Sequence, residues 1–208
     1  MSETSRHEHW QDVYASKPPD RLGWYKPRLD TSLEWIGDLD LPADAPIIDI
    51  GCGASTLVDD LLDAGYSAIT ALDIAENALE LMQRRLGNSA DRVDWLAADI
   101  TNADLPGDHF RLWHDRAVFH FLTEAGDRER YRERMASALA SGGYLLIGLF
   151  TPEAPPRCSG LPVQRYTLEQ LSAELGAGFE VIRHRHEPHI TPGGVEQAYL
   201  YALFRKSA

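Results

Sequence analysis

Hydrophobic residues form short runs that alternate with segments of helical periodicity from about residue 46 onward. The first run, at residues 47–50, is apolar on both faces except for one acid and predicts a buried parallel strand. Further strands are predicted at residues 67–72, 93–98, 110–118 and 144–150, and helices at residues 56–64, 75–86, 128–140 and 167–175. A capping box of Thr167 and Gln170 opens the last of these helices. Such alternation is typical of an α/β fold.

The last two apolar runs, at residues 179–187 and 196–205, follow each other without an intervening helix. A loop containing Thr191-Pro192-Gly193-Gly194 joins them. Strands connected without a crossover helix pair antiparallel. The predicted fold is therefore a doubly wound, mainly parallel seven-stranded sheet with an antiparallel last strand, in three α-β-α layers.

The first 45 residues have a different pattern. Two short helices are predicted, at residues 6–15 and from residue 31 onward, with the breaker cluster Lys17-Pro18-Pro19-Asp20 between them. We interpret residues 1–45 as a helical cover of the active site and residues 46–208 as the core. A chain of 208 residues suits one domain overall.

Composition excludes several classes of function. The net charge is −12, and the only dense basic run, residues 128–134, is interleaved with Glu129 and Glu133. That run indicates a solvated helix face, so we expect no nucleic-acid partner. The longest apolar run, residues 144–150, is too short to span a bilayer, and residues 1–10 lack a signal-peptide pattern. Two cysteines indicate no disulfide framework, and a cytoplasmic protein without a membrane partner is expected.

The strongest local motif is Ile-Ile-Asp-Ile-Gly-Cys-Gly-Ala-Ser at residues 47–55. Gly51 and Gly53 allow a sharp strand–helix turn that a ligand can approach closely. A lone Gly-x-Gly also occurs in ordinary turns, but acids at predicted strand ends strengthen the ligand interpretation. Asp73 follows Gly51 by 22 residues, the offset at which doubly wound folds bind ribose hydroxyls, and Asp99 ends the next strand.

These features resemble the class I S-adenosylmethionine-dependent methyltransferases, over residues 46–150, and imply their Rossmann-like fold. The resemblance implies that the glycine turn lies against the methionine part of S-adenosylmethionine, that Asp73 holds the ribose, and that Asp99 contacts the adenine amino group. The cofactor-binding residues implied are Asp49, Gly51, Cys52, Gly53, Asp73, Ile74, Asp99, Ile100 and Asp115. Ser55 departs from the family pattern, since many members have a third glycine there.

Aromatic residues near the N-terminus extend this resemblance. The segment His9-Trp10-x-x-x-Tyr14, followed by Trp24-Tyr25, is similar to a lid of small single-domain members, some of which methylate protein lysines and others small molecules. A sulfonium is a cation, and aromatic faces attract cations, so Trp24 is expected to cover the cofactor and Tyr25 to contact substrate. Simple aromatic packing is the alternative.

Polar residues near the end of the fourth predicted strand are candidates for contact with the methyl acceptor. Imidazole titrates near neutral pH, which makes the two histidines there candidate bases. The catalytic candidates are His114, Asp115 and His120, and the substrate-binding candidates are Tyr25, Arg116, Phe119, Arg157, Cys158, Arg165 and Tyr166. At the strand end, a purely structural network of Asp115 and Arg116 is the alternative. The loop around Cys158 is long for a connection, which favours a role in binding the substrate.

Three histidines near the C-terminus, His184, His186 and His189, carry a weaker signal. No cysteine or acid completes a metal site at a recognisable spacing, so we predict a polar strand face and no metal.

The sequence therefore predicts an S-adenosylmethionine-dependent methyltransferase that forms S-adenosylhomocysteine and acts on a sulfur, nitrogen or oxygen atom of a small molecule. A protein lysine methyltransferase is the alternative within the family. Two other classes remain open: an NAD-dependent oxidoreductase, which Thr56 in place of a third glycine disfavours, and a non-catalytic cofactor-binding subunit.

Overall fold

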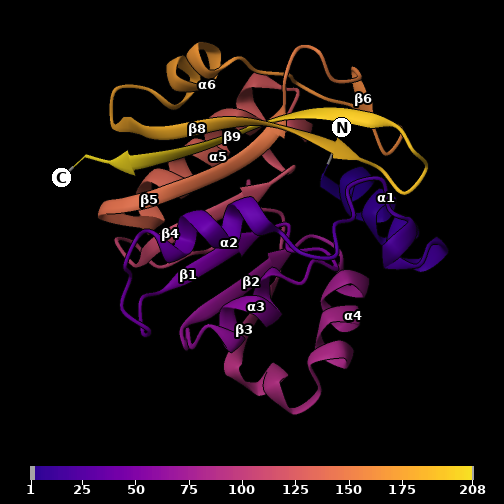
Figure 1. The fold of residues 1–208 in the computed structure, drawn as a ribbon, viewed down its shortest axis with the longest axis horizontal. Helices are drawn as coiled ribbons and strands as arrows, with labels where there is room; N and C mark the ends of the chain where they lie inside the picture. The colour runs from indigo at the N-terminus through magenta and orange to yellow at the C-terminus, as the bar shows by residue number, and fades with distance from the viewer. Residues whose placement is uncertain (1–2, 208) are drawn as a thin grey trace.

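A seven-stranded sheet runs through the centre of the computed structural model, which describes residues 3–207 (Figure 1). Its strands lie in the order β3-β2-β1-β4-β5-β9-β8, and only β9 runs antiparallel to its neighbours. They are β1 (Ile47–Ile50), β2 (Ile69–Asp73), β3 (Val93–Ala97), β4 (Phe110–Arg116), β5 (Leu139–Phe150), β8 (Phe179–Ile190) and β9 (Glu196–Lys206). The predicted doubly wound sheet is confirmed, and its antiparallel last strand inserts between β5 and β8 instead of forming an edge.

Helices cover both faces of this sheet. The α-helices are α1 (Glu3–Ser16), α2 (Asp30–Gly37), α3 (Leu57–Asp63), α4 (Glu76–Leu86), α5 (Ala125–Ala138) and α6 (Leu168–Leu175). The short elements are the 3-10 helices η1 (Pro19–Arg21), η2 (Gly87–Arg92) and η3 (Phe119–Phe121), and the hairpin β6 (Arg157–Cys158) and β7 (Leu161–Pro162). One hydrophobic cluster joins α2, α3 and α4 to the sheet, and another joins α5 and α6 to the opposite face, which gives the three layers.

The two-residue repeat of a strand decides which layer each side chain of β4 meets. Leu112 belongs to the cluster on the α2–α3 side, whereas Trp113 belongs to the cluster on the α5 side. By the same alternation His114 faces the first layer and Asp115 the second. Neighbours in the sequence are therefore sent into different environments.

The two N-terminal helices have different positions. Helix α1 lies beside the cavity described below, next to α4 (Figure 1), and Trp24 of the following loop also lines that cavity. Helix α2 packs on the sheet, because Trp35 and Ile36 are apolar, 1% exposed, and part of the main core cluster. The division of the chain at residue 45 stays a prediction.

The connection between α5 and β5 also differs from the prediction. Helix α5 ends at Ala138, and β5 starts at once at Leu139, so Gly142 and Gly143 lie inside the strand. The pairing of β4 with β5 shifts register here, and Gly142 has a φ of +71°. A glycine at a bulge explains why the pair was mistaken for a helix stop.

The turn after β1 requires its first glycine for two reasons. Gly51 has a φ of +60°, a region that side chains rarely adopt, and a Cβ there would lie 2.0 Å from Cγ2 of Val118. Val118 follows β4, so the glycine lets the turns after two neighbouring strands pack against each other. This close approach fixes the floor of the site.

Gly51→Ala is expected to lower the free energy of unfolding by about 2–4 kcal/mol, because backbone strain adds to overpacking. Urea denaturation measures the effect. Adding Val118→Ala should recover the overpacking part only. Gly178→Ala is the matched control, since its Cβ would meet no atom within 4 Å. Equal losses at both glycines would contradict this account.

Candidate active site

A carboxylate at the end of β2 holds the glycine turn in place. The Gly53 N–H donates to Oδ2 of Asp73 at 2.9 Å, and the Ala75 N–H donates to Oδ1 at 2.8 Å. Burial raises the pKa of Asp73 to about 6, although these backbone hydrogen bonds act in the opposite direction. The Tyr14 hydroxyl lies over the turn, only 2.4 Å from where a Cβ of Gly53 would be. Asp73 thus holds the glycine turn in place, and Tyr14 of α1 lies over the same turn.

An apolar cavity of about 750 Å³, including its open mouth, lies over the carboxyl ends of β1, β2 and β4. Strands bring their end residues together at this edge, where ligands of open α/β sheets bind. The strands and the segments after them supply Ile50, Gly51, Leu72, Ile74, Ala98, Asp99, Ile100, Arg116, Ala117, Val118, Phe121, Leu122 and Cys158, and the N-terminal segment supplies Arg6, Trp10, Tyr14 and Trp24. We call this space the first cavity. Its mostly apolar wall with few polar groups is typical of a small-molecule site.

A second cavity adjoins the first and shares Trp24, Gly51 and Arg116 with it. Asp49 and His114 line it and form a buried chain with Ser32. Nδ1 of His114 lies 2.6 Å from Oδ1 of Asp49, and Nε2 lies 2.9 Å from the Ser32 hydroxyl. The other oxygen of Asp49, Oδ2, is buried and has no hydrogen-bond partner within residues 3–207. Cys52 also lines this cavity, as predicted for the glycine turn.

One face of α1 closes over the first cavity. Arg6, Trp10 and Tyr14 follow each other at intervals of four residues, so they share that face and all line the cavity. Trp10 and Tyr14 belong to the lid-like segment of the sequence, whereas Arg6 was not predicted, although this spacing marks it. Residues that line the cavity thus come from α1 as well as from the strand ends.

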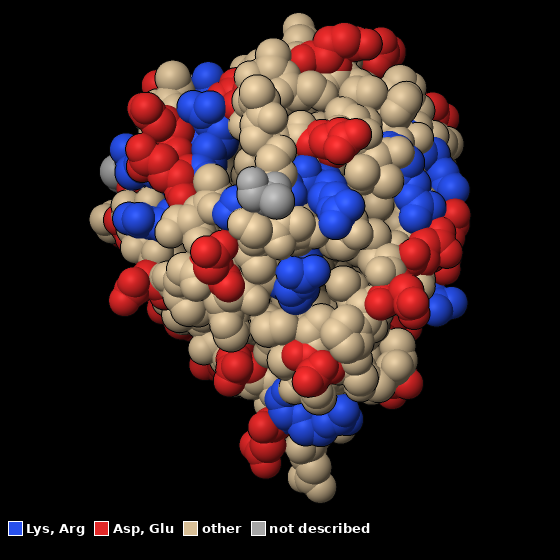
Figure 2. Space-filling view, turned by 90° about the vertical axis from the view of Figure 1, so that its left-hand side faces the viewer, with Lys and Arg blue, Asp and Glu red and all other residues tan. Residues whose placement is uncertain are grey.

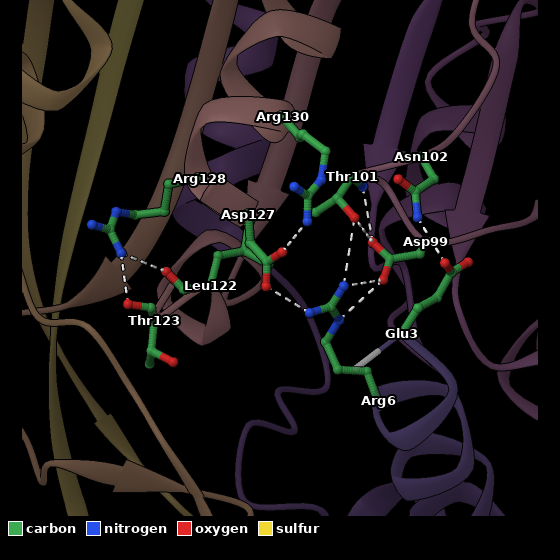
Figure 3. Close-up of polar contacts among 10 residues, drawn as sticks. All are labelled: Glu3, Arg6, Asp99, Thr101, Asn102, Leu122, Thr123, Asp127, Arg128 and Arg130. Atoms are coloured by element: carbon green, nitrogen blue, oxygen red, sulfur yellow. Dashed lines mark hydrogen bonds and ion pairs between the residues drawn. The ribbon is translucent and has the colours of Figure 1, made fainter. Parts of the chain in front are cut away.

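Arg6 binds two carboxylates at once (Figure 3). Its Nη2 lies 2.6 Å from Oδ2 of Asp99, and its Nη1 lies 2.7 Å from Oδ2 of Asp127, at the start of α5. Thr101 donates to the second oxygen of Asp99 through both its N–H and its hydroxyl. Arg6 and both acids are less than 10% exposed. Asp99 therefore reaches the cavity, as predicted, but Arg6 neutralises it there.

Arg6→Met is expected to lower the free energy of unfolding by about 3–5 kcal/mol, because it leaves the buried Asp99 without a cation and removes one of the two cations beside Asp127. Raised proteolysis near α1 should accompany the loss, since the fork anchors that helix. The control is Arg84→Met, which removes an exposed pair with Glu80 and should cost under about 1 kcal/mol. Denaturant unfolding and limited proteolysis test both, and a loss in Arg6→Met no larger than that in the control would refute the anchoring role.

Asp115 supports the fold and lines neither cavity. Its side chain is fully buried and accepts hydrogen bonds from the Val118 N–H at 2.9 Å, the Phe119 N–H at 3.1 Å and the Tyr131 hydroxyl at 2.6 Å. Burial raises its pKa to about 6. This placement gives no support to the expected catalytic and cofactor roles of Asp115, because strand alternation turns its side chain toward α5. Its predicted network with Arg116 does not form either, since Arg116 faces the other side.

The histidines of this segment are poor candidates for a base. Both ring nitrogens of His114 are already hydrogen-bonded. His120 is fully buried, lines neither cavity, and has no hydrogen-bond partner within residues 3–207 for either nitrogen. Burial lowers its pKa to about 3, so the ring is neutral. Phe119 and Tyr166 stack on each other in the core, 5.7 Å between ring centroids, away from a substrate.

Tyr131→Phe tests the structural role of Asp115. It removes a donor to Asp115 and the acceptor of the Trp113 indole N–H, 2.8 Å away, so two buried groups lose a partner. We expect the free energy of unfolding to fall by about 1–3 kcal/mol. Tyr144→Phe, at a partly buried tyrosine on β5, is the control. Unchanged stability in Tyr131→Phe would argue against this role.

Arg116 extends from the end of β4 to the junction of the two cavities. Its Nη1 donates to the carbonyl of Trp24 at 2.8 Å, its Nε donates to the Tyr201 hydroxyl at 2.8 Å, and the guanidinium lies 4.9 Å from the centre of the Tyr199 ring. Its predicted contact with substrate stays a prediction. Arg116 fixes the loop that carries Trp24 and Tyr25, which both line the second cavity.

The predicted residues of the long loop separate in the structure. Cys158 is buried and lines the first cavity, and burial raises its thiol pKa to about 11, so it is not a thiolate nucleophile. Arg157 lies in a neighbouring surface cleft. Arg165 instead donates to the carbonyls of Pro152 and Ala154 and braces the loop.

The C-terminal histidines do not converge on one point. His184 and His186 are exposed, whereas His189 is buried and lies 2.8 Å from the Gly23 carbonyl through Nε2. Among residues 3–207, no group of three or more histidines, cysteines or acids could hold a metal ion. Within the same range, every helix is too short or too polar to cross a membrane.

Comparisons with known proteins point to methyltransferases. Residues 47–143 match a methyltransferase domain family. Human EEF1A lysine methyltransferase 2 is 23% identical over 205 residues, covering 90% of this chain and 79% of that protein. Bovine eEF1A lysine and N-terminal methyltransferase is 26% identical over 151 residues, 68% of this chain, but the alignment spans only 21% of that protein.

A solved structure shares the fold over nearly the whole chain. The Burkholderia thailandensis 1,6-didemethyltoxoflavin-N1-methyltransferase, described with its substrate and S-adenosylhomocysteine bound, has a TM-score of 0.71 and 21% identity, over 99% of this chain and 85% of that one. The matched domain and the shared fold agree with the strand order and the glycine turn described above. The chain therefore contains a methyltransferase domain over residues 47–143 and has the fold of S-adenosylmethionine-dependent methyltransferases of known structure.

Proposed function

We propose that this protein is an enzyme that binds S-adenosylmethionine across the two joined cavities and transfers its methyl group to a small molecule. The supporting observation is the first cavity itself, an apolar slot over the carboxyl ends of β1, β2 and β4 with Asp99 on its wall. Ile74 and Ile100 offer apolar contacts for a purine ring. Carboxylate and apolar groups together suit adenine, which has a polar edge and flat faces.

The second cavity supports the placement of the methionine part. Asp49 lines it beside Gly51, and its Oδ2, which has no hydrogen-bond partner within residues 3–207, suits an ammonium group. Trp24 lies at the junction, where an aromatic face stabilises a sulfonium. Arg6 and Tyr14 cover Asp99 and Asp73, so the proposal requires α1 to shift before these acids meet the adenosine.

The chain contributes binding and alignment more than proton transfer. When bound, S-adenosylmethionine would supply a methyl group on a sulfonium, whose sulfur would keep the carbon–sulfur electron pair as the acceptor takes the methyl group. Any proton of the acceptor then leaves to water. No general base is assigned, because His114 is hydrogen-bonded at both nitrogens, whereas His120 and Asp115 line neither cavity. Alignment of the two reactants is the main expected source of rate.

Surface charge and enclosure support a small acceptor over nucleic acid. Figure 2 shows blue and red side chains interspersed on the face at the left of Figure 1, without a continuous basic surface there. Helix α1 covers the first cavity, and a small acceptor requires a smaller shift of this helix than a large partner would. The match to EEF1A lysine methyltransferase 2 favours a protein lysine as the second candidate acceptor.

Ala98→Phe is expected to fill the first cavity, because Ala98 lines its wall. Calorimetry should show at least tenfold weaker binding of S-adenosylmethionine, or about 1.4 kcal/mol, than in the unaltered protein. Ala136→Phe, on the exposed side of α5, is the matched control and should bind normally. Thermal unfolding checks that both variants fold.

Absence of S-adenosylmethionine binding by the unaltered protein would refute the proposal, and NADH binding in its place would favour an oxidoreductase. A screen with methyl-labelled cofactor over thiols, amines, hydroxyls and carboxylates then identifies the acceptor. Binding without transfer to any of these or to protein lysines would favour a non-catalytic subunit.

A further inference from the structure

A surface cleft lies against the first cavity and carries only positive charge. It is formed by the loop after α1, by β6, and by the turn between β8 and β9. Lys17, Arg21 and Arg157 line it, and no aspartate or glutamate does. We call it the basic cleft.

The cations of the basic cleft are not paired with acids. None of the three forms an ion pair with any residue that the structure describes, and Arg157 donates only to the carbonyl of Gly160. Asp20 and Glu196 are neighbours in the sequence but do not line the cleft. In a chain of net charge −12, three unpaired cations in one concavity form a local field that attracts anions.

A buried amide gives a second, independent sign of a ligand. Gln197 lines the basic cleft and is only 7% exposed, yet its Oε1 has no hydrogen-bond partner within residues 3–207. Buried amide groups almost always have a partner. Because Oε1 accepts hydrogen bonds, its partner would be a donor group of the bound molecule and not the oxygens of an anionic end.

The basic cleft shares two residues with the first cavity. Trp24 and Cys158 line both, so they form the boundary between them. Arg116 lies in the first cavity at the same side, and its Nη2 is buried without a hydrogen-bond partner in the described chain. A molecule seated in the cleft would therefore extend past Trp24 and Cys158 toward the site of transfer.

We infer that the basic cleft binds the anionic end, a carboxylate or a phosphate, of a small organic acceptor. The inference rests on the proposed methyltransferase function and narrows its substrate class. The same positive charge opposes a lysine side chain, which is itself a cation. The cleft thus selects against the acceptor of the lysine methyltransferases that the chain resembles.

Amide chemical-shift titration of the isotope-labelled protein tests the cleft directly. The probes are benzoate, phenyl phosphate and the neutral benzyl alcohol. We expect saturable shifts at residues 157–160 and 193–197 with one or both anions and none with the alcohol, and the tighter anion identifies the headgroup. Arg21→Glu combined with Arg157→Glu should weaken binding at least tenfold.

The matched control combines Arg92→Glu with Arg134→Glu, two exposed cations outside the cleft, and should bind anions as before. If the double reversal unfolds, the corresponding glutamine variants replace it. A hexaglutamate peptide is a further probe. The inference would be overturned if neither small anion gave saturable shifts, including the case in which only the peptide binds, or if the control variant weakened anion binding equally. Calorimetry with S-adenosylmethionine on the same samples reads the proposed function separately, because the cleft arginines lie outside the first two cavities.

Discussion

The fork of Arg6 between Asp99 and Asp127 is the interaction on which the architecture of the site depends. It joins α1, the end of β3 and the start of α5, which are far apart in the sequence. Each of the three ions is almost wholly removed from water, so both carboxylates are stabilised by Arg6, and Asp127 also by Arg130. Through this contact a helix with little apolar surface of its own is held over an apolar cavity.

The same fork links closure of the site to its chemistry. Asp99 is the acid that the family pattern assigns to the adenine, and the helix that covers the cavity uses that acid as its anchor. Tyr14 has a corresponding position over Gly53 and Asp73. Any shift of α1 would expose both acids together, because Arg6 and Tyr14 lie on one face of one helix.

Charge is distributed unevenly across this acidic protein. About half of its arginines pair with carboxylates within residues 3–207, as Arg85 pairs with Asp59 and Arg183 pairs with Asp38. The arginines of the basic cleft form no such pair there, and neither does Arg116, whose partners are a phenol and a carbonyl. Cations that lie beside a cavity and have no acid as a partner indicate a site for a negatively charged ligand more than a structural role.

The amino-acid sequence alone was enough to predict the sheet, the order of strands and helices along the chain, and the glycine turn. Apolar periodicity sets these, since each strand and helix must bury its own apolar face. The sequence also placed Asp73, Asp99 and Ile74 at strand ends, and the ends of parallel strands share one edge.

The sequence could not determine the direction and the partner of each polar side chain. His114, Asp115 and Arg116 are consecutive, yet tertiary packing sends them to a buried hydrogen-bond chain, the α5 layer and the cavity junction. Only the folded chain brings Arg6 to Asp99 and gathers Lys17, Arg21 and Arg157, because such contacts depend on how distant elements pack, which no local pattern records.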